Sequence, residues 1–342
     1  MKIALDGMGG DSAPGVIVEG AVEAVNEFGY DIILVGQESI LKKELAKYTY
    51  DAGKIVIEHA PQVVDMGDSP VASIRAKKNS SVSVAVNLVK EKKANALVSA
   101  GNTGATVCAA SFNLGLLKGI ERPGISIVFP TSNKGNALMI DAGANIDTKP
   151  IHLFQYGLMA DAYCKFILGK QNPRVGLLSI GEEKTKGTGF VKEGHKLLDD
   201  SKINFIGNIE GRDIFTGGCD IILCDGFVGN VVLKVAESLA GAVSTLLKRE
   251  LSRNLFTIWG ALLCRSTFEA LKKELDYAEY GGAPLLGING TCIISHGSSS
   301  ARAIKNALKV ADKFTRQDVN KHIIDGLGQY SGREMHGKKE ER

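Results

Sequence analysis

Glycine and short polar residues gather at two points where an apolar run of the chain ends, and their pattern favours anion binding. The two segments read SAGNTGA from residue 99 and HGSSS from residue 296. The glycines leave backbone N–H groups open, and the helix predicted after each segment adds the positive end of its dipole, which together suit phosphate. We expect the following residues to bind the anion: Gly101, Asn102, Thr103, Gly104, Gly297, Ser298 and Ser299.

Further segments of the same character follow other apolar runs: 6–14, 141–145, 181–187 and 225–230. Each of them, taken singly, is equally explained as the N-cap of a helix. Caps alone do not require so much glycine, so the whole set is harder to explain in that way. Ligands of an open parallel sheet bind outside the carboxyl ends of its strands. We therefore expect all these segments to lie at equivalent ends of one sheet.

Two side chains in these segments could carry charge to a substrate, and Lys234, in GNVVLK, is a further cationic candidate without an assigned role. Lys184 lies in the segment GEEKTKG, where pairing with Glu182 or Glu183 is the alternative role, and His296 ends an apolar run, where a core histidine is the alternative. Carboxylates also occur at run ends and could in principle gather on Mg²⁺: Asp6, Asp11, Asp141 and Asp225. Because such residues more often cap helices, we expect no metal.

Missing motifs narrow the class of enzyme. The chain has no G-x-x-x-x-G-K-[ST] and no G-x-S-x-G, which excludes a P-loop NTPase and argues against an α/β-hydrolase. The segment GMGGDS from residue 7 has Ser12 where a dinucleotide fingerprint needs its third glycine. No H-E-x-x-H or paired Cys/His set supports a catalytic zinc. We therefore expect a reaction without a cofactor.

The composition is that of a globular protein with a sizeable core. The 342 residues are 44% hydrophobic and 23% charged, and the net charge of +3 gives no general case for nucleic-acid binding. The six cysteines are scattered, which fits reduced thiols in a cytosolic protein. The first residues are too polar for a signal peptide, and no run reaches 18 uninterrupted apolar residues. We expect a cytoplasmic protein with no membrane-spanning segment.

Short β-branched runs alternate with helical patterns, which predicts a three-layer α/β/α sandwich around a mainly parallel sheet of about ten strands. The strands are predicted at 2–5, 32–36, 55–58, 95–99, 125–129, 137–141, 175–180, 203–207, 220–224 and 291–295. Helices are predicted near 15–28, 81–92, 103–114, 151–169, 188–199, 228–250 and 298–325. No linker divides the chain, so we expect one domain over 1–330 and a flexible tail over 331–342.

One stretch, 251–277, interrupts this alternation. It contains the only tryptophan, Trp259, and it mixes apolar with basic residues. A helical pair packed on the core is one interpretation. The other is an amphipathic helical arm, inserted over about 240–277, that contacts a membrane, a partner subunit or an acidic carrier protein. The contact residues are then Leu255, Trp259, Leu262, Leu263, Arg253 and Arg265.

Several longer motifs, taken in their order, resemble the bacterial phosphate acyltransferase family. They read MKIALDGMGGDSAP, ASIRAKKNSS, SAGNTGA, DAGAN, LLSIGEEKTKG, DGFVGNVVLK and GAPLLGINGTCIISHGSSS. The resemblance runs from residue 1 to about 325. Two small departures are Gly7, where the family usually has Ala, and Ser179, where Asn is common.

The resemblance implies a fold similar to phosphotransacetylase and to isocitrate/isopropylmalate dehydrogenase. It also implies transfer of a fatty acyl group from acyl carrier protein to inorganic phosphate, which gives acyl phosphate for phospholipid synthesis. The family is implied to be homodimeric, metal-free and peripherally associated with the membrane, where the membrane glycerol-phosphate acyltransferase takes the next step.

This chemistry needs no enzyme nucleophile, because a thioester is already activated and phosphate is already an anion; it needs positioning and stabilisation of an oxyanion. We expect Lys184 to neutralise the phosphate, Asn230 or Asn145 to donate to the thioester oxygen, and His296 to orient the nucleophile or protonate the leaving thiolate. Three other interpretations stay open: a short-chain phosphotransacetylase acting on acyl-CoA, a decarboxylating dehydrogenase, and a binding protein without activity.

Overall fold

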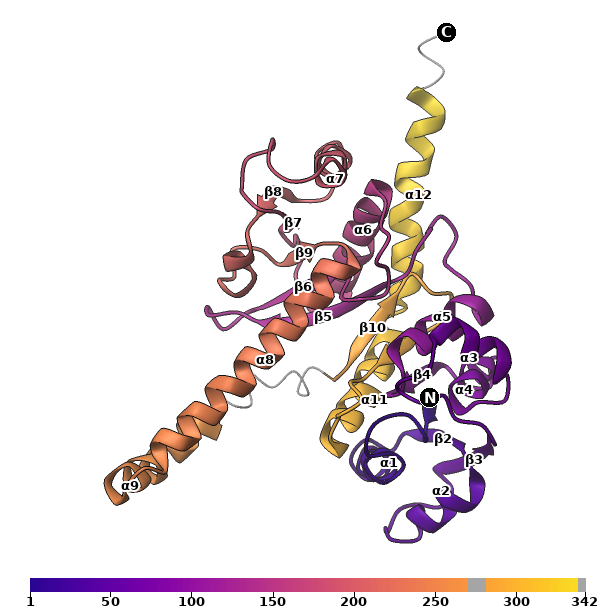
Figure 1. Cartoon of the computed structure of the whole chain (residues 1–342). Coiled ribbons are helices and arrows are strands. Elements are labelled where there is room, and N and C mark those ends of the chain that lie inside the picture. Colours follow the sequence, from indigo (N-terminus) through magenta and orange to yellow (C-terminus); the bar gives the residue numbers. More distant parts are fainter. Residues whose placement is uncertain (270–280, 338–342) are drawn as a thin grey trace.

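The computed structural model describes residues 1–269 and 281–337, and they form one twisted sheet between helical layers (Figure 1). The sheet has eleven strands in the order β3-β2-β1-β4-β11-β10-β5-β6-β9-β7-β8. The strands are β1 (Lys2–Asp6), β2 (Asp31–Gly36), β3 (Ile55–His59), β4 (Ala96–Ser99), β5 (Gly124–Pro130), β6 (Asn136–Ile140), β7 (Val175–Leu178), β8 (Phe205–Ile209), β9 (Ile221–Leu223), β10 (Ala283–Leu286) and β11 (Cys292–Ile294). All ten predicted strands are confirmed, and β10 is an addition.

The sheet reverses its direction in the middle. Strand β10 is antiparallel to both β11 and β5, and β5 is antiparallel to β6. Strands β1, β4 and β11 are parallel to one another, and so are β6, β9 and β7, but the second set runs opposite to the first. The glycine-rich segments therefore form two groups that lie at opposite ends of the strands. The first group follows β1, β4 and β11, and the second follows β6, β7 and β9. The expectation that all of them lie at equivalent ends is wrong.

Helices cover both faces of the sheet, which confirms the three-layer architecture. They are α1 (Gly15–Phe28), α2 (Glu38–Leu45), α3 (Pro70–Ala76), α4 (Ser81–Lys90), α5 (Thr103–Asn113), α6 (Pro150–Phe166), α7 (Gly189–Asp199), α8 (Gly226–Leu251), α9 (Leu255–Leu263), α11 (Ala301–Arg316), α12 (Val319–Gly337) and the short 3₁₀ helix η1 (Gly211–Phe215). The alternation of a strand divides the core: Ala4 packs with α4 and α5, whereas Ile3 and Leu5 pack with α1 and α11.

Helices α2 and α3 were not predicted, and the helix predicted at 298–325 is two helices. The break falls at Asp318, whose φ of 48° lies in the left-handed region and ends α11. Helix α12 continues to Gly337, so the predicted tail 331–342 begins inside a helix and ends outside the described residues. The assignment of the chain to one domain stays a prediction.

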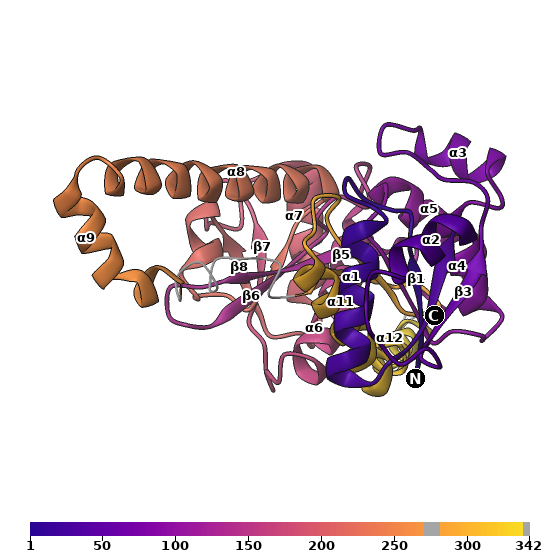
Figure 2. The same cartoon turned by 90° about the horizontal axis from the view of Figure 1, so that it is seen from below.

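Helix α8 leaves the body of the molecule, with α9 at its far end, as two views at right angles show (Figures 1 and 2). The part of the predicted arm that the structure describes, to residue 269, is thus a projection and not a helical pair packed on the core. Its apolar side chains face outward: Phe256 is 90% exposed and Trp259 is 67% exposed. By length and composition alone, α8 is also long and apolar enough to cross a membrane.

The start of α8 packs against the segment after β6 at glycine positions. A Cβ atom at Gly229 would overlap the backbone carbonyl of Asp141, and one at Gly226 would overlap the backbone of Asn145. Backbone contact this close fixes the direction in which α8 leaves the sheet. Further along the same helix, Gly241 has nothing within 4 Å of the corresponding position.

Alanine at these two helical glycines is expected to have opposite effects on stability. Gly229→Ala forces α8 away from Asp141 and should lower the free energy of unfolding by about 1–3 kcal/mol. Gly241→Ala adds helix propensity at an open site and should raise it by up to about 1 kcal/mol. Denaturant unfolding of both variants measures the difference, and equal stabilities would contradict the close packing at Gly229.

Candidate active site

Three glycine-rich segments meet at the carboxyl ends of the neighbouring strands β1, β4 and β11. A Cβ atom at Gly9 would lie 2.6 Å from the backbone nitrogen of Gly101. The backbone N–H of Asp11 donates to the carbonyl oxygen of Gly297 at 2.8 Å. Glycine is required at Gly9 because the two backbones touch there. The structure thus brings the residues predicted for anion binding at 101–104 and 297–299 into one place.

A buried carboxylate lies beneath this place. Asp6, at the end of β1, accepts a hydrogen bond from the Ser99 hydroxyl at 2.8 Å, and that hydroxyl accepts one from the backbone N–H of Gly101 at 3.2 Å. Burial raises the pKa of Asp6, and the hydrogen bonds from Ser99 and other groups act against that rise. Asp6 therefore anchors the first and second segments from below.

The predicted anion-binding residues divide into anchoring and open groups. Asn102 uses both ends of its amide: Oδ1 accepts from the N–H of Ala105 at 2.9 Å, and Nδ2 donates to the carbonyl of Met66 at 3.0 Å. It caps α5 and holds the 65–68 loop. Ser299 is buried, whereas Thr103 and Ser298 are exposed and offer hydroxyl groups to a ligand.

The second group of segments surrounds Asp141, which has no exposed surface. Its carboxylate accepts from the backbone N–H groups of Ile125, Gly143, Ala144 and Asn145 at 2.8–3.1 Å. Burial raises the pKa of Asp141, and these donors oppose the rise. The segment is a rigid seat for α8, since the N–H of Gly226 donates to the carbonyl of Asn145 at 2.9 Å.

The two asparagines predicted as oxyanion donors have different surroundings. The Nδ2 group of Asn145 donates to Asp141 Oδ2 and to the Tyr156 hydroxyl, both at 2.9 Å, and also contacts the carbonyl of Pro123. Asn230 is exposed on α8, beside Gly143. The geometry therefore favours Asn230 as a donor to a substrate. It favours Asn145 as a residue that stabilises the segment against which α8 packs.

Helix α8 connects the two groups of segments: it begins in the second group and passes beside the first. The Nζ atom of Lys234 lies 3.0 Å from Nε2 of His296 and 2.9 Å from a carboxylate oxygen of Glu237. That oxygen lies 4.0 Å from the same ring nitrogen, and the other ring nitrogen, Nδ1, lies 2.8 Å from the Ser298 hydroxyl. A cation, a carboxylate, an imidazole and a hydroxyl thus meet beside the glycine-rich segments. The sequence pointed to His296 and Ser298, and to Lys234 only as one cationic candidate without a role. Glu237 was missed, and its spacing of three residues from Lys234 on a helix was the available signal.

Lys184 lies elsewhere. Its side chain is 71% exposed and forms an ion pair of 2.8 Å with Asp199, while Glu182 pairs with Arg212. The pairing with neighbouring acids that was considered as its alternative role is therefore replaced by a partner on α7. Within residues 1–269 and 281–337, its contacts join it to α7 and not to His296. A role for Lys184 stays a prediction.

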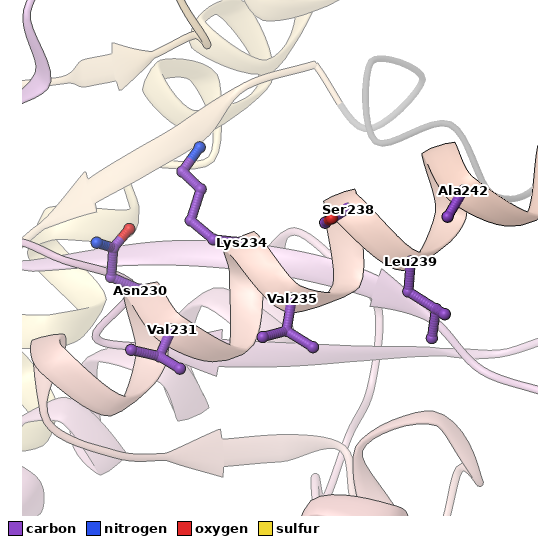
Figure 3. Close-up of a pocket in the computed structure, with 7 residues that line it drawn as sticks. All are labelled: Asn230, Val231, Lys234, Val235, Ser238, Leu239 and Ala242. Carbon is purple, nitrogen blue, oxygen red and sulfur yellow. The ribbon is translucent and has the colours of Figure 1, made fainter.

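Over the same described ranges, no group of three or more His, Cys, Asp and Glu side chains is arranged to hold a metal ion. A shallow groove, wide open to solvent, runs along α8, and Figure 3 shows its lining side chains, all of which belong to that helix. Asn230, Lys234 and Ser238 form a polar row, and beside it lies an apolar row of Val231, Val235, Leu239 and Ala242.

A family model described as "Fatty acid synthesis protein" matches residues 1–322. The phosphate acyltransferase of Geotalea uraniireducens is 49% identical over 327 residues, which cover 96% of this chain and 94% of the relative. The chain belongs to the phosphate acyltransferase family. It is an acyltransferase of lipid biosynthesis, and phosphate is one of its substrates.

Solved structures bear out the predicted fold. EutD phosphotransacetylase from Staphylococcus aureus is 16% identical with a TM-score of 0.60, and the match covers 92% of this chain and 94% of that one. A putative 4-hydroxythreonine-4-phosphate dehydrogenase from Salmonella typhimurium is 13% identical with a TM-score of 0.52, covering 92% and 98%. At these identities the likeness concerns the fold alone.

Substitution of the two asparagines is expected to separate stability from activity. Asn145→Ala removes a donor from buried Asp141 and Tyr156 and should lower the free energy of unfolding by about 1–3 kcal/mol. Asn230→Ala should change stability by less than about 0.5 kcal/mol. Loss of an oxyanion donor should lower kcat of Asn230→Ala by about 10²–10³-fold. A change in kcat below about threefold would show that Asn230 is not the oxyanion donor, because the loss of one such donor normally costs far more.

Proposed function

We propose that this phosphate acyltransferase moves a long-chain fatty acyl group from acyl carrier protein to inorganic phosphate, forming acyl phosphate for phospholipid biosynthesis. The observation that carries the proposal is the groove along α8, in which an apolar row lies beside the polar row that contains Lys234. A thioester carbonyl placed near Lys234 and His296 leaves its acyl chain free to lie along the apolar row. An acetyl group has no use for such a row.

The apolar row extends away from the polar cluster toward the arm. From Lys234 to Leu239 the helix rises about 7.5 Å, and the row continues to Ala242. Leu239 is 62% exposed, so it has apolar surface available for a bound chain. Burial of apolar surface against a long acyl chain supplies binding energy that a short acyl group cannot provide.

The charges at the far end of the arm fit an acidic donor and an acidic surface. Arg253 and Arg265 flank α9, and Arg265 already forms an ion pair with Glu269 at 2.7 Å. The outward apolar side chains of α9 (Leu255, Trp259, Leu262 and Leu263) are of the kind that enter a membrane interface. We place the acyl carrier protein on the basic flank and the lipid headgroups against α9. The protein is then cytoplasmic and peripheral to the membrane that holds the glycerol-phosphate acyltransferase.

A second copy of the chain is the partner that we propose for the outer part of α8. Val243, Leu246 and Leu247 are exposed there and lie beyond the groove. A homodimer buries such side chains, as an obligate interface requires. Light scattering of the purified chain should give twice the mass of one chain, and a monomer at micromolar concentration would contradict the homodimer.

The acyl donor is tested with palmitoyl-acyl carrier protein, palmitoyl-CoA and acetyl-CoA, each with inorganic phosphate. Wild-type protein should release carrier thiol and acyl phosphate from the carrier substrate in a phosphate-dependent manner. Leu239→Asn should raise KM for the palmitoyl donor by about tenfold, because it removes most of one apolar contact. The variant Leu197→Asn, on helix α7, is the matched control and should not change KM.

Three other outcomes of this assay would contradict the proposed donor or the proposed position of the acyl chain. Turnover of acetyl-CoA alone would favour a short-chain phosphotransacetylase. A palmitoyl KM that is unchanged in Leu239→Asn would show that the acyl chain does not lie along α8. Turnover of palmitoyl-CoA but not of the carrier substrate would leave the long-chain groove in place and refute the carrier.

Contact of α9 with lipid is tested through Trp259, the only tryptophan. Vesicles that contain an anionic lipid should shift its fluorescence to shorter wavelength and carry the protein to the pellet. Leu263→Ser should weaken this binding severalfold, whereas Ile180→Ser, at an equally exposed site on the body, should not. An unchanged emission spectrum and a protein that stays in the supernatant would contradict the membrane contact.

A further inference from the structure

We propose that Lys234 and Glu237 belong to the reaction centre, where Lys234 binds the attacking phosphate beside His296 and Glu237 is a positioning residue that holds the Lys234 ammonium. The inference rests on the phosphate acyltransferase activity of the family and not on the acyl donor proposed above. No part of it requires the carrier protein or a long acyl chain.

We infer the tautomer of His296 from its contact with Lys234. A lysine ammonium donates hydrogen bonds and cannot accept them, so the 3.0 Å contact with Lys234 makes Nε2 of the ring an acceptor. The ring proton then lies on Nδ1 and is donated to the Ser298 hydroxyl at 2.8 Å. The backbone N–H of Ser298 is directed at the same nitrogen from 3.2 Å, and in this tautomer it meets an N–H group and forms no hydrogen bond there. Lys234 and Ser298 together therefore leave Nε2 as the basic atom that faces the groove.

This arrangement suits a phosphate that replaces the contact between Lys234 and His296. An ammonium binds an anionic oxygen more strongly than a neutral imidazole, because the negative charge of the oxygen adds Coulomb attraction to the hydrogen bond. The nearby start of α11, capped by Ser300, adds the positive end of a helix dipole. With Lys234 on a phosphate oxygen, Nε2 of His296 faces the phosphate hydroxyl.

The transfer step balances without any further reactant. An oxygen of hydrogen phosphate attacks the thioester carbon and forms the new C–O bond. The tetrahedral intermediate then collapses, and the C–S bond breaks. His296 Nε2 takes the proton of the phosphate hydroxyl and gives it to the departing sulfur, so that acyl phosphate and a thiol result. General acid–base transfer of this kind is worth about 10²–10⁴-fold in rate.

Glu237 acts through Lys234. Its carboxylate lies 2.9 Å from the ammonium but 4.0 Å from the ring, and it lies one turn further along a helix that Gly226 and Gly229 seat firmly. The Lys234 side chain is half exposed and would otherwise sample many rotamers, whereas the Glu237 side chain is only 21% exposed. The ion pair therefore selects the rotamer that reaches His296.

The test measures KM for phosphate and kcat separately for each variant and asks which of the two constants changes. The thioester is the one that the wild-type protein turns over fastest. Lys234→Met should raise KM for phosphate by about 10–100-fold and leave KM for the thioester within about threefold. His296→Asn should lower kcat by about 10²–10⁴-fold. Glu237→Gln should raise KM for phosphate by a smaller factor. The matched controls are Lys165→Met and Asp161→Asn, which break a helical ion pair of 2.7 Å on α6 and should change neither constant.

A double-mutant cycle tests whether Glu237 acts through Lys234. Glu237→Gln should have no further effect on KM for phosphate in the Lys234→Met background. Additive effects of Glu237→Gln and Lys234→Met on KM for phosphate would refute the positioning role. Equal effects of Lys234→Met and Lys165→Met would refute the whole inference. If the wild-type protein accepts only short-chain donors, KM for phosphate and kcat can still be measured with such a donor. Failure of the proposed acyl donor and failure of the proposed reaction centre therefore give different results.

Discussion

The contact between the Lys234 ammonium and Nε2 of His296 is the interaction on which the organisation of the site depends. The two residues belong to groups of segments that lie at opposite ends of the strands, because the sheet reverses at β10 and β5. Helix α8 bridges them: it begins after β9 in one group and passes the end of β11 in the other. This bridge brings the Lys234 ammonium beside the backbone donors of the glycine-rich segments.

The same helix links the chemistry to the outside of the molecule. Its first turn is fixed by backbone contact at Gly226 and Gly229, its third carries Lys234, and its far end holds α9 in solvent. A continuous helix resists bending between these points, so the groove, the cation and the apolar tip keep a constant relation. An enzyme that takes an apolar acyl chain, as we propose, and an anion at once uses both kinds of surface, and here one helix carries them both.

Much of the fold could be predicted because buried parallel strands are near-continuous apolar runs, and all ten predicted strands exist. Strand β10 was missed because it has only four residues and contains Pro284, which argues against a strand. The direction of each strand leaves no trace in its periodicity, so the separation of the segments into two groups could not be foreseen. His296 and the glycines stood out by type and spacing. Lys234 was only one cationic candidate among several, because a lysine three residues before a glutamate on a helix looks like any surface ion pair until the fold brings His296 to it.

A crystal structure grown with inorganic phosphate tests the central claim most directly. We expect a phosphate oxygen within about 2.7–2.9 Å of the Lys234 Nζ atom, with the phosphate against the 296–299 segment and the contact between Lys234 and His296 replaced. A phosphate bound at Lys184 and the 181–187 segment, with the contact between Lys234 and His296 intact, would contradict it.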